Sequence, residues 1–156
     1  MYDVVIIGAG PGGLFAAYEL KEKNEKLRVA LVDKGALASK RICPMSKMGC
    51  ACKNCKPCGI LSGFGGAGTF SDGKLNFIPK LGKSDLFKYM SKSEAYKLID
   101  DTESIFNKFN MDSDVYPTDM KSAEAIKKDI AKLGAELLII KQKQATHGCL
   151  LFVFLH

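Results

Sequence analysis

The stretch "YDVVIIGAGPGGLFAAYELKEKNEKLRVALVDKG", residues 2–35, decides the fold. Its β-branched run at 4–7 is too short for a helix and predicts a strand buried on both faces. A glycine-rich turn follows, and residues 14–23 predict a helix rich in Leu, Ala and Glu. The apolar residues 28–32 predict a second strand. The order of strand, turn, helix and strand indicates an α/β protein.

The turn carries the pattern G-x-G-x-x-G at Gly8, Gly10 and Gly13. Gly8 permits a tight turn, Gly10 lets the backbone approach a pyrophosphate, and Gly13 lets the helix pack close to the strand. The N–H groups at the start of the helix would hold the phosphates. Asp33 follows at the distance typical of a ribose-binding acid, and a carboxylate there fits FAD or NAD rather than NADP. The pattern predicts a Rossmann-type FAD/NAD(P)-binding domain, against the alternative of a glycine turn in another α/β protein.

Composition and charge narrow the class of protein. The 156 residues are 47% hydrophobic and 26% charged, as in an ordinary globular chain. The formal net charge is +6, but all except two of the 23 basic residues are lysines spread along the chain, so a lysine-rich surface is favoured over a nucleic-acid site. No tract of about 18 apolar residues predicts a membrane span, and the start does not resemble a signal peptide. A cytoplasmic location is therefore expected.

A second glycine-rich stretch, "GILSGFGGAGTFSDGKL", covers residues 59–75. It contains the spacing of a phosphate loop, but Leu75 stands where the magnesium-binding Ser or Thr is needed, which argues against an NTPase. Two interpretations stay open. The stretch is either a loop of backbone N–H groups lying against a flat polar ligand or a surface turn at Asp72-Gly73.

The stretch "CPMSKMGCACKNCKPC", residues 43–58, holds five of the six cysteines. A cytoplasmic location argues against a disulfide framework. Three thiols in seven residues, with a Cys-Pro upstream, are typical of a [4Fe–4S] cluster. Zinc, a redox-active dithiol and bystander thiols stay open as alternatives, and Cys50 is expected to be a spare thiol. The predicted metal ligands are Cys43, Cys52, Cys55 and Cys58.

The second half of the chain predicts two helices, at 91–109 and 119–133, and a strand at 136–140. Ser91 and Glu94 form a capping box, and Gly134 suits a helix C-terminus. The apolar residues expected to face the core are Tyr96, Ile99, Phe106 and Phe109 in the first helix and Ala123, Ile126, Ile130 and Leu133 in the second. The only histidines, His147 and His156, lie near the end of the chain, which leaves a serine or cysteine hydrolase without a base.

The opening "DVVIIGAGPGGLFAAYEL…VALVDKG" resembles the FAD-binding start of the glutathione-reductase-like flavoprotein superfamily. The pairing "KRICP…CKNCKPCGILSGFGGAGTFSDGKL" is similar to one uncharacterised bacterial and archaeal branch of FAD-dependent dehydrogenases. The resemblance is strong over residues 1–80 and loose over 81–140. Members of that branch are much longer, so we expect an N-terminal fragment with a divergent tail.

The resemblance implies the FAD-binding portion of a flavin-dependent oxidoreductase, with a small-molecule redox substrate or an electron carrier as partner. Arg41 would lie near the adenine-side phosphates, residues 65–68 beside the isoalloxazine ring, and Ser71 and Lys74 at the flavin edge. No catalytic residue, substrate or oligomeric state is predicted. The alternative is an iron–sulfur or zinc module, or a truncated fragment, without independent catalysis. The expected cofactor-binding residues are Gly8, Gly10, Pro11, Gly12, Gly13, Asp33, Lys34, Arg41, Gly65, Gly66, Ala67, Gly68, Ser71 and Lys74.

The expected organisation has four parts: residues 1–42 start an incomplete Rossmann-type domain, and 43–80 form a cysteine-rich and glycine-rich cofactor loop. Residues 81–141 continue that domain with a helical segment or begin a substrate domain, and 142–156 are the divergent tail.

Overall fold

The computed structural model describes residues 1–45, 49–109, 111 and 114–144. These divide into two compact units, Met1–Gly73 and a second that begins at Lys74. The two histidines and the tail beyond Gln144 lie outside the described residues, so the predictions made for them stay predictions.

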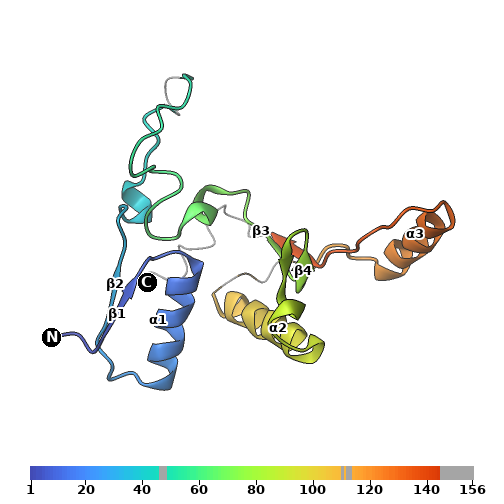
Figure 1. Ribbon diagram of the computed structural model, residues 1–156, viewed down its shortest axis with the longest axis horizontal. Coiled ribbons are helices and arrows are strands. Elements are labelled where there is room, and N and C mark those ends of the chain that lie inside the picture. The colour runs from blue at the N-terminus through green and yellow to red at the C-terminus, as the bar shows by residue number, and fades with distance from the viewer. Residues whose placement is uncertain (46–48, 110, 112–113, 145–156) are drawn as a thin grey trace. The chain divides into compact units, whose positions relative to one another are not determined.

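The first unit begins with strand β1 (Val4–Ile7), helix α1 (Pro11–Lys23) and strand β2 (Val29–Val32). The two strands pair in parallel over their whole length, and α1 packs alongside both of them, as Figure 1 shows. Asp3 accepts from Arg28 Nε at 3.0 Å and from a terminal guanidinium nitrogen at 2.8 Å, which fixes the register where the strands begin. The predicted strand, turn, helix and strand are confirmed.

The prediction that β1 is buried on both faces is wrong for the described residues. Val5 is 58% exposed and Ile7 is 89% exposed, whereas Leu14 of α1 is buried. Side chains alternate across a strand, so the helix covers only every second residue. Because the sheet has two strands and one covering helix, its second face carries apolar side chains that no described residue covers.

The described residues of the second unit form four short strands, two α-helices and one short 3₁₀ helix. Antiparallel pairs join β3 to β6 and β4 to β5. Their bounds are β3 (Lys74–Asn76), β4 (Lys80–Leu81), β5 (Ser84–Asp85), η3 (Leu86–Lys88), α2 (Lys92–Lys108), α3 (Met120–Lys132) and β6 (Gln142–Gln144). The strand expected at 136–140 is absent, because the strand that finds a partner lies at β6, opposite β3.

Helix α2 starts with the predicted capping box. The Ser91 hydroxyl accepts from the backbone N–H of Glu94 at 3.3 Å, and the Glu94 carboxylate accepts from the Ser91 N–H at 2.9 Å. Of the apolar stripe expected to face the core, Tyr96 is 54% exposed. The helix instead buries Ala95 and a carboxylate, that of Glu103.

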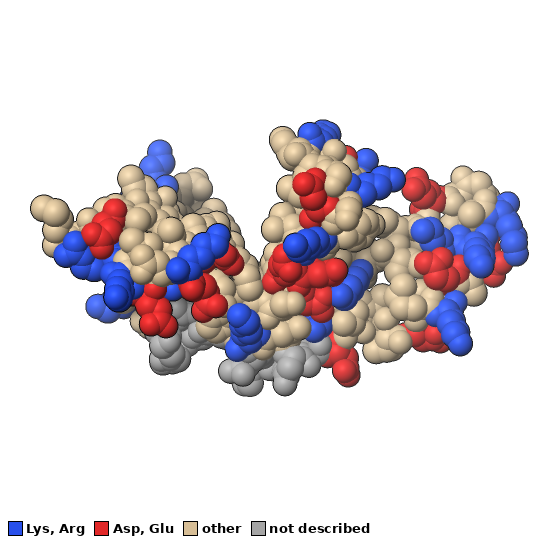
Figure 2. All heavy atoms as spheres, turned by 90° about the horizontal axis from the view of Figure 1, so that it is seen from below, with Lys and Arg blue, Asp and Glu red and all other residues tan. Residues whose placement is uncertain are grey.

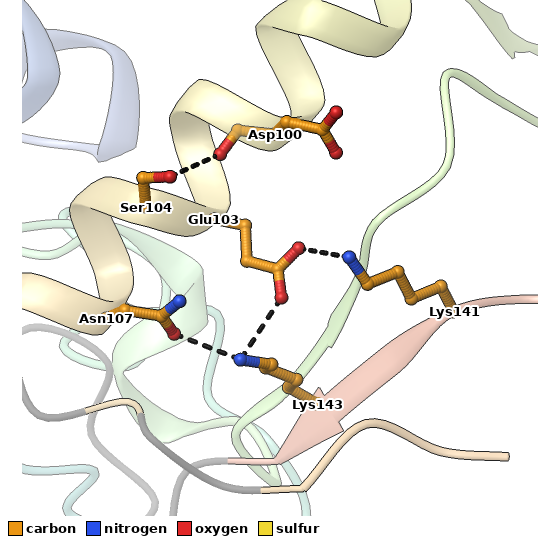
Figure 3. A network of polar contacts seen from close by, with 6 residues as sticks. All are labelled: Asp100, Glu103, Ser104, Asn107, Lys141 and Lys143. Atoms are coloured by element: carbon orange, nitrogen blue, oxygen red, sulfur yellow. Dashed lines mark hydrogen bonds and ion pairs between the residues drawn. The ribbon is translucent and has the colours of Figure 1, made fainter. Parts of the chain in front are cut away.

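Glu103 joins α2 to β6 through ion pairs with two lysines, shown in Figure 3. Its Oε2 contacts the Lys141 ammonium, and its Oε1 lies 3.1 Å from Nζ of Lys143. Lys143 also donates to Asn107 Oδ1 at 3.0 Å and is only 8% exposed. Burial raises the pKa of Glu103, but the hydrogen bonds and charges of Lys141 and Lys143 outweigh it and leave the pKa below its ordinary value.

Helix α3 begins at Asp119, whose carboxylate accepts from the N–H groups of Lys121 and Ser122 at 3.0 and 3.1 Å. Gly134 follows the helix with a φ of +80°, as a C-terminal glycine should. The expectation that one side of α3 faces inward is wrong: none of its residues is buried, because no other described element covers its apolar stripe. Each described helix is too short or too polar to cross a bilayer.

Charged side chains of both signs are interspersed over the face of the molecule in Figure 2. Blue lysines and arginines sit beside red carboxylates over α2 and α3 rather than forming a continuous basic surface there.

Candidate dinucleotide site

The turn between β1 and α1 depends on two glycines, Gly8 and Gly13, at which a side chain would be strained or would clash. Gly8 adopts a φ of +102° and its N–H donates to the Val32 carbonyl at 2.7 Å. A Cβ placed on Gly13 would lie 1.8 Å from the Gly8 carbonyl oxygen, far inside van der Waals contact. The third glycine of the pattern therefore brings the helix against the strand end, as the spacing predicts.

The other side of the same turn is open. Apart from its chain neighbours and the local helix backbone, no heavy atom of a described residue lies within 4 Å of the position that a Cβ would take on Gly10 or Gly12. Among the three described α-helices, α2 and α3 have a side chain that caps the N-terminus, whereas α1 starts at Gly10 without one and has no acidic residue in its first turn. The first N–H groups of α1 therefore have no described side-chain cap, and a helix N-terminus of this kind favours an anion.

Asp33 lies at the end of β2, next to this turn. Its Oδ2 accepts from the Ala9 N–H at 2.9 Å and its Oδ1 from the Gly35 N–H at 2.8 Å. The N–H groups of Gly35 and Ala9 lower the pKa of Asp33, and the charge of Lys34 lowers it further. An ionised carboxylate with two donors bound keeps acceptor sites for further hydrogen bonds, such as those of ribose hydroxyls.

The second glycine stretch lies against the first. The Gly65 N–H donates to the Ala9 carbonyl at 2.7 Å. A Cβ on Gly66, whose φ is +65°, would lie 3.3 Å from both Gly10 Cα and Pro11 Cδ. The structure therefore brings two of the predicted loop residues to the predicted phosphate turn.

Arg41 lies outside the second glycine stretch in sequence but hydrogen-bonds four of its residues. It is 4% exposed, and its guanidinium lies 4.9 Å from the centre of the Phe70 ring. Its Nε donates at 2.9 Å and one terminal nitrogen at 2.8 and 3.1 Å, while the other terminal nitrogen makes a further bond. The acceptors are the carbonyls of Gly59, Ile60 and Phe64 and the hydroxyl of Thr69. Arg41 thus holds the loop together, and its predicted place near the phosphates stays a prediction.

The remaining predicted residues are spread over both units. Ala67 and Gly68 lie in the short helix η2 (Ala67–Phe70), and the Ser71 hydroxyl donates to the Gly68 carbonyl at 2.8 Å. Lys74 begins β3 in the second unit and lines a cleft of about 390 Å³ there. The predicted contacts of these residues with a flavin stay predictions.

The cysteines do not gather around a point. Cys50, Cys52 and Cys55 are exposed, and among the described residues no group of three or more Cys, His, Asp or Glu side chains could hold a metal ion. The expected iron–sulfur or zinc site is therefore not supported, because the seven-residue run extends its thiols into solvent instead of folding them around a centre. Cys58 differs: the backbone N–H groups of Leu61 and Ile60 lower the pKa of its thiol, and the charge of Arg41 adds to the effect.

Two parts of the site were not singled out from the sequence. Ala9, the variable residue between Gly8 and Gly10, is fully buried and bonds both Asp33 and Gly65. Thr69 is buried, and its hydroxyl accepts a hydrogen bond from Arg41. A small residue between two glycines is the signal that could have marked Ala9, whereas Thr69 carries none.

Comparisons with known proteins agree with this geometry. A 39-residue segment is 59% identical to the mitochondrial electron transfer flavoprotein-ubiquinone oxidoreductase of Arabidopsis thaliana, and it spans 22% of this chain and 6% of that protein. No solved structure matches the chain. The model of the pyridine nucleotide-disulphide oxidoreductase family matches residues 2–140. This family implies a Rossmann-like FAD/NAD(P)-binding domain, and the chain belongs to the pyridine nucleotide-disulphide oxidoreductase family.

Proposed function

We propose that this chain is the FAD-binding portion of a flavin-dependent oxidoreductase whose substrate is a small molecule or an electron carrier. The observation that carries the proposal is the turn of residues 8–13, closed at Gly13 and open at Gly10 and Gly12, at a helix start without a side-chain cap. The family match and the flavoprotein relative support the same conclusion.

The residues present fit the nucleotide half of FAD. The glycine turn would hold the pyrophosphate, since a Cβ on Gly10 would project into the space that the phosphates need. Asp33 would accept from the ribose hydroxyls, and its negative charge disfavours a 2′-phosphate in the same place. Gly65 and Gly66, held against the turn, would continue the binding surface toward the flavin.

The chemistry of the bound cofactor is the transfer of a hydride or of single electrons, which FAD supplies. The protein's share is to bind and orient it. Arg41 fixes the loop by four hydrogen bonds, so the surface beside the turn is ordered before a ligand arrives. Lys74 and Ser71 remain our candidates for tuning the flavin edge.

Titration of the purified full chain with FAD, followed by flavin fluorescence, tests this proposal. Gly10→Val fills the open side of the turn, and we expect its affinity to fall at least about tenfold because the phosphates lose their close approach. Ala16→Val is the matched control, since it places the same valine side chain at an exposed position of α1. Circular dichroism of both variants checks that α1 still forms.

Loss of binding in Gly10→Val alone supports the proposal. Equal affinities of the two variants would place the ligand elsewhere and overturn the assigned site. A wild-type chain that shows neither FAD nor ADP binding at millimolar ligand would refute the proposal for this chain.

A further inference from the structure

Cys58, at the turn that follows the exposed cysteines, differs from them in burial and has a thiol of lowered pKa. Cys58 is half-buried, and the backbone N–H groups of Leu61 and Ile60 lower the pKa of its thiol. The Ser62 N–H donates to the Cys58 carbonyl at 2.8 Å, which closes the turn and fixes those two donors around the sulfur. Cys52 and Cys55 lie exposed in solvent, and the contacts of Cys52 are with Asn54.

Arg41 places a buried positive charge beside the same turn. Its guanidinium donates to the carbonyls of Gly59 and Ile60, the two residues that follow Cys58. Two N–H donors and a fixed cation next to one sulfur are the surroundings that make a thiol nucleophilic.

A second thiol faces the same interior. Burial alternates from Arg41 to Met45: Arg41 and Met45 are buried, Ile42 is 62% exposed, and Cys43 between them is half-buried. Arg41 has extended backbone angles, and in an extended chain every second side chain lies on one side, so we infer that Cys43 shares the side of Arg41.

The backbone brings the two cysteines together. A Cβ on Gly59 would lie 2.6 Å from the carbonyl oxygen of Ile42, so these two chain segments touch. Cys58 precedes Gly59 and Cys43 follows Ile42, and each thiol is thus one residue from the contact.

We propose that Cys58 is a modification site, a thiol that hydroperoxides oxidise and that Cys43 resolves as a disulfide. The Cys58 sulfur attacks the terminal oxygen of the peroxide: a sulfur–oxygen bond forms, the oxygen–oxygen bond breaks, and the peroxide takes two electrons and leaves as an alcohol or water with the thiol proton. The Cys43 sulfur then attacks Cys58, the sulfur–sulfur bond forms, and the hydroxyl leaves as water with the Cys43 proton.

The position of this pair gives its oxidation a route to the cofactor loop. Arg41 binds the carbonyls on the Cys58 turn with one side of its guanidinium and the Phe64 carbonyl and Thr69 hydroxyl with the other. A disulfide between Cys58 and Cys43 would change the turn whose carbonyls, at Gly59 and Ile60, accept from Arg41. The modification therefore acts on the element that orders the glycine loop.

Treatment of the purified full chain with hydrogen peroxide, alkylation of the remaining thiols and tryptic peptide mapping test this proposal. The expected product joins the peptide of residues 42–47 to that of residues 54–74, with the linkage assigned by fragmentation to Cys43 and Cys58. We expect Cys58 to be oxidised at least about ten times faster than Cys55 in the same peptide.

Two variants sharpen the result. Cys43→Ser removes the resolving thiol, so Cys58 should stop at a sulfenic acid that dimedone traps. Cys55→Ser, the matched control three residues from Cys58, should leave the linkage unchanged. Equal oxidation of Cys55 and Cys58, a linkage that omits either Cys43 or Cys58, or thiols protected by stoichiometric bound metal would each overturn the proposal.

Discussion

Glu103→Gln removes the one carboxylate that two lysines share at the junction of α2 and β6 (Figure 3). The amide keeps the size of the side chain and one acceptor oxygen but loses the charge. Lys143, with a side chain 9% exposed, is then left as a buried ammonium whose remaining contact among the described residues is the neutral Asn107. The change therefore separates the ionic contribution from packing.

The magnitude follows from the exposure of each partner. Breaking a buried ion pair by removing one partner costs about 3–5 kcal/mol. We take about 3 kcal/mol for the pair with Lys143, the lower end, because the glutamine oxygen can still accept from its ammonium. The pair with Lys141, whose side chain is 43% exposed, adds about 1 kcal/mol or less. The total of about 3–4 kcal/mol corresponds to an opening equilibrium raised about 150- to 900-fold.

Hydrogen exchange of the α2 and β6 amides near neutral pH measures this opening directly. The chain folds as two units, so one global unfolding free energy would mix their transitions, whereas exchange reports each segment. Asp100→Asn is the control on the same helix, because the exposed Asp100 contributes its carbonyl, not its carboxylate, to the bond from Ser104.

The pH dependence has a defined sign. The folded-state pKa of Glu103 is lowered from the ordinary 4.5, so its contribution is complete above that value and is lost as the pH falls through the folded-state pKa. Protection in the wild type should therefore fall on acidification below pH 4.5, and Glu103→Gln should show a weaker fall.

A change below about 1 kcal/mol, or one equal to that of Asp100→Asn, would refute the reasoning, since it would show that solvent already screens the pair. Lys143→Met in the Glu103→Gln background provides a second check. If the cost is that of an unpaired buried ammonium, this second substitution should restore much of the lost protection.

Three further substitutions address the first unit. Gly13→Ala puts a methyl group 1.8 Å from the Gly8 oxygen, so α1 must shift. We expect a loss of about 1–3 kcal/mol in the hydrogen-exchange protection of the α1 amides, and wild-type protection would contradict the packing. Arg41→Lys keeps the charge but loses the planar guanidinium, so hydrogen exchange of the Gly65 amide should become faster. Unchanged exchange would show that the loop is ordered without the four hydrogen bonds of Arg41. Asp33→Asn should weaken nucleotide binding at neutral pH. Because the pKa of Asp33 is lowered, wild-type binding should stay constant as the pH falls, until the pH passes below the ordinary carboxyl value of 3.8. A loss of binding at a higher pH would contradict the ionised state.

The sequence was enough to predict the first thirty-five residues, because each local signal there points to the same structure. A β-branched run, a glycine turn and an acid at the end of the next strand leave one arrangement, and the structure has it. The capping box at Ser91 was equally local and is present. Such features depend on neighbours within a few residues, so periodicity and spacing reveal them.

Features that depend on distant partners were predicted less well. β6 formed at 142–144 rather than at 136–140, because the choice was made by a partner, β3, that lies far away in the sequence. The burial of Glu103 against two lysines likewise required knowledge of the fold. Arg41 was predicted to lie near the adenine-side phosphates, whereas its hydrogen bonds to the loop reach carbonyls up to 23 residues away.

The close approach of Gly59 to Ile42 also defines where foreign sequence could be grafted into this protein. The cysteine segment leaves the body of the first unit at Arg41 and returns at Gly59, and both points are fixed to each other by backbone contact and by the guanidinium. Residues 50–57 between them are exposed. A peptide tag or reporter inserted there would begin and end at two points that already contact each other, so we expect the length of the insert to leave the geometry of the nucleotide turn unchanged.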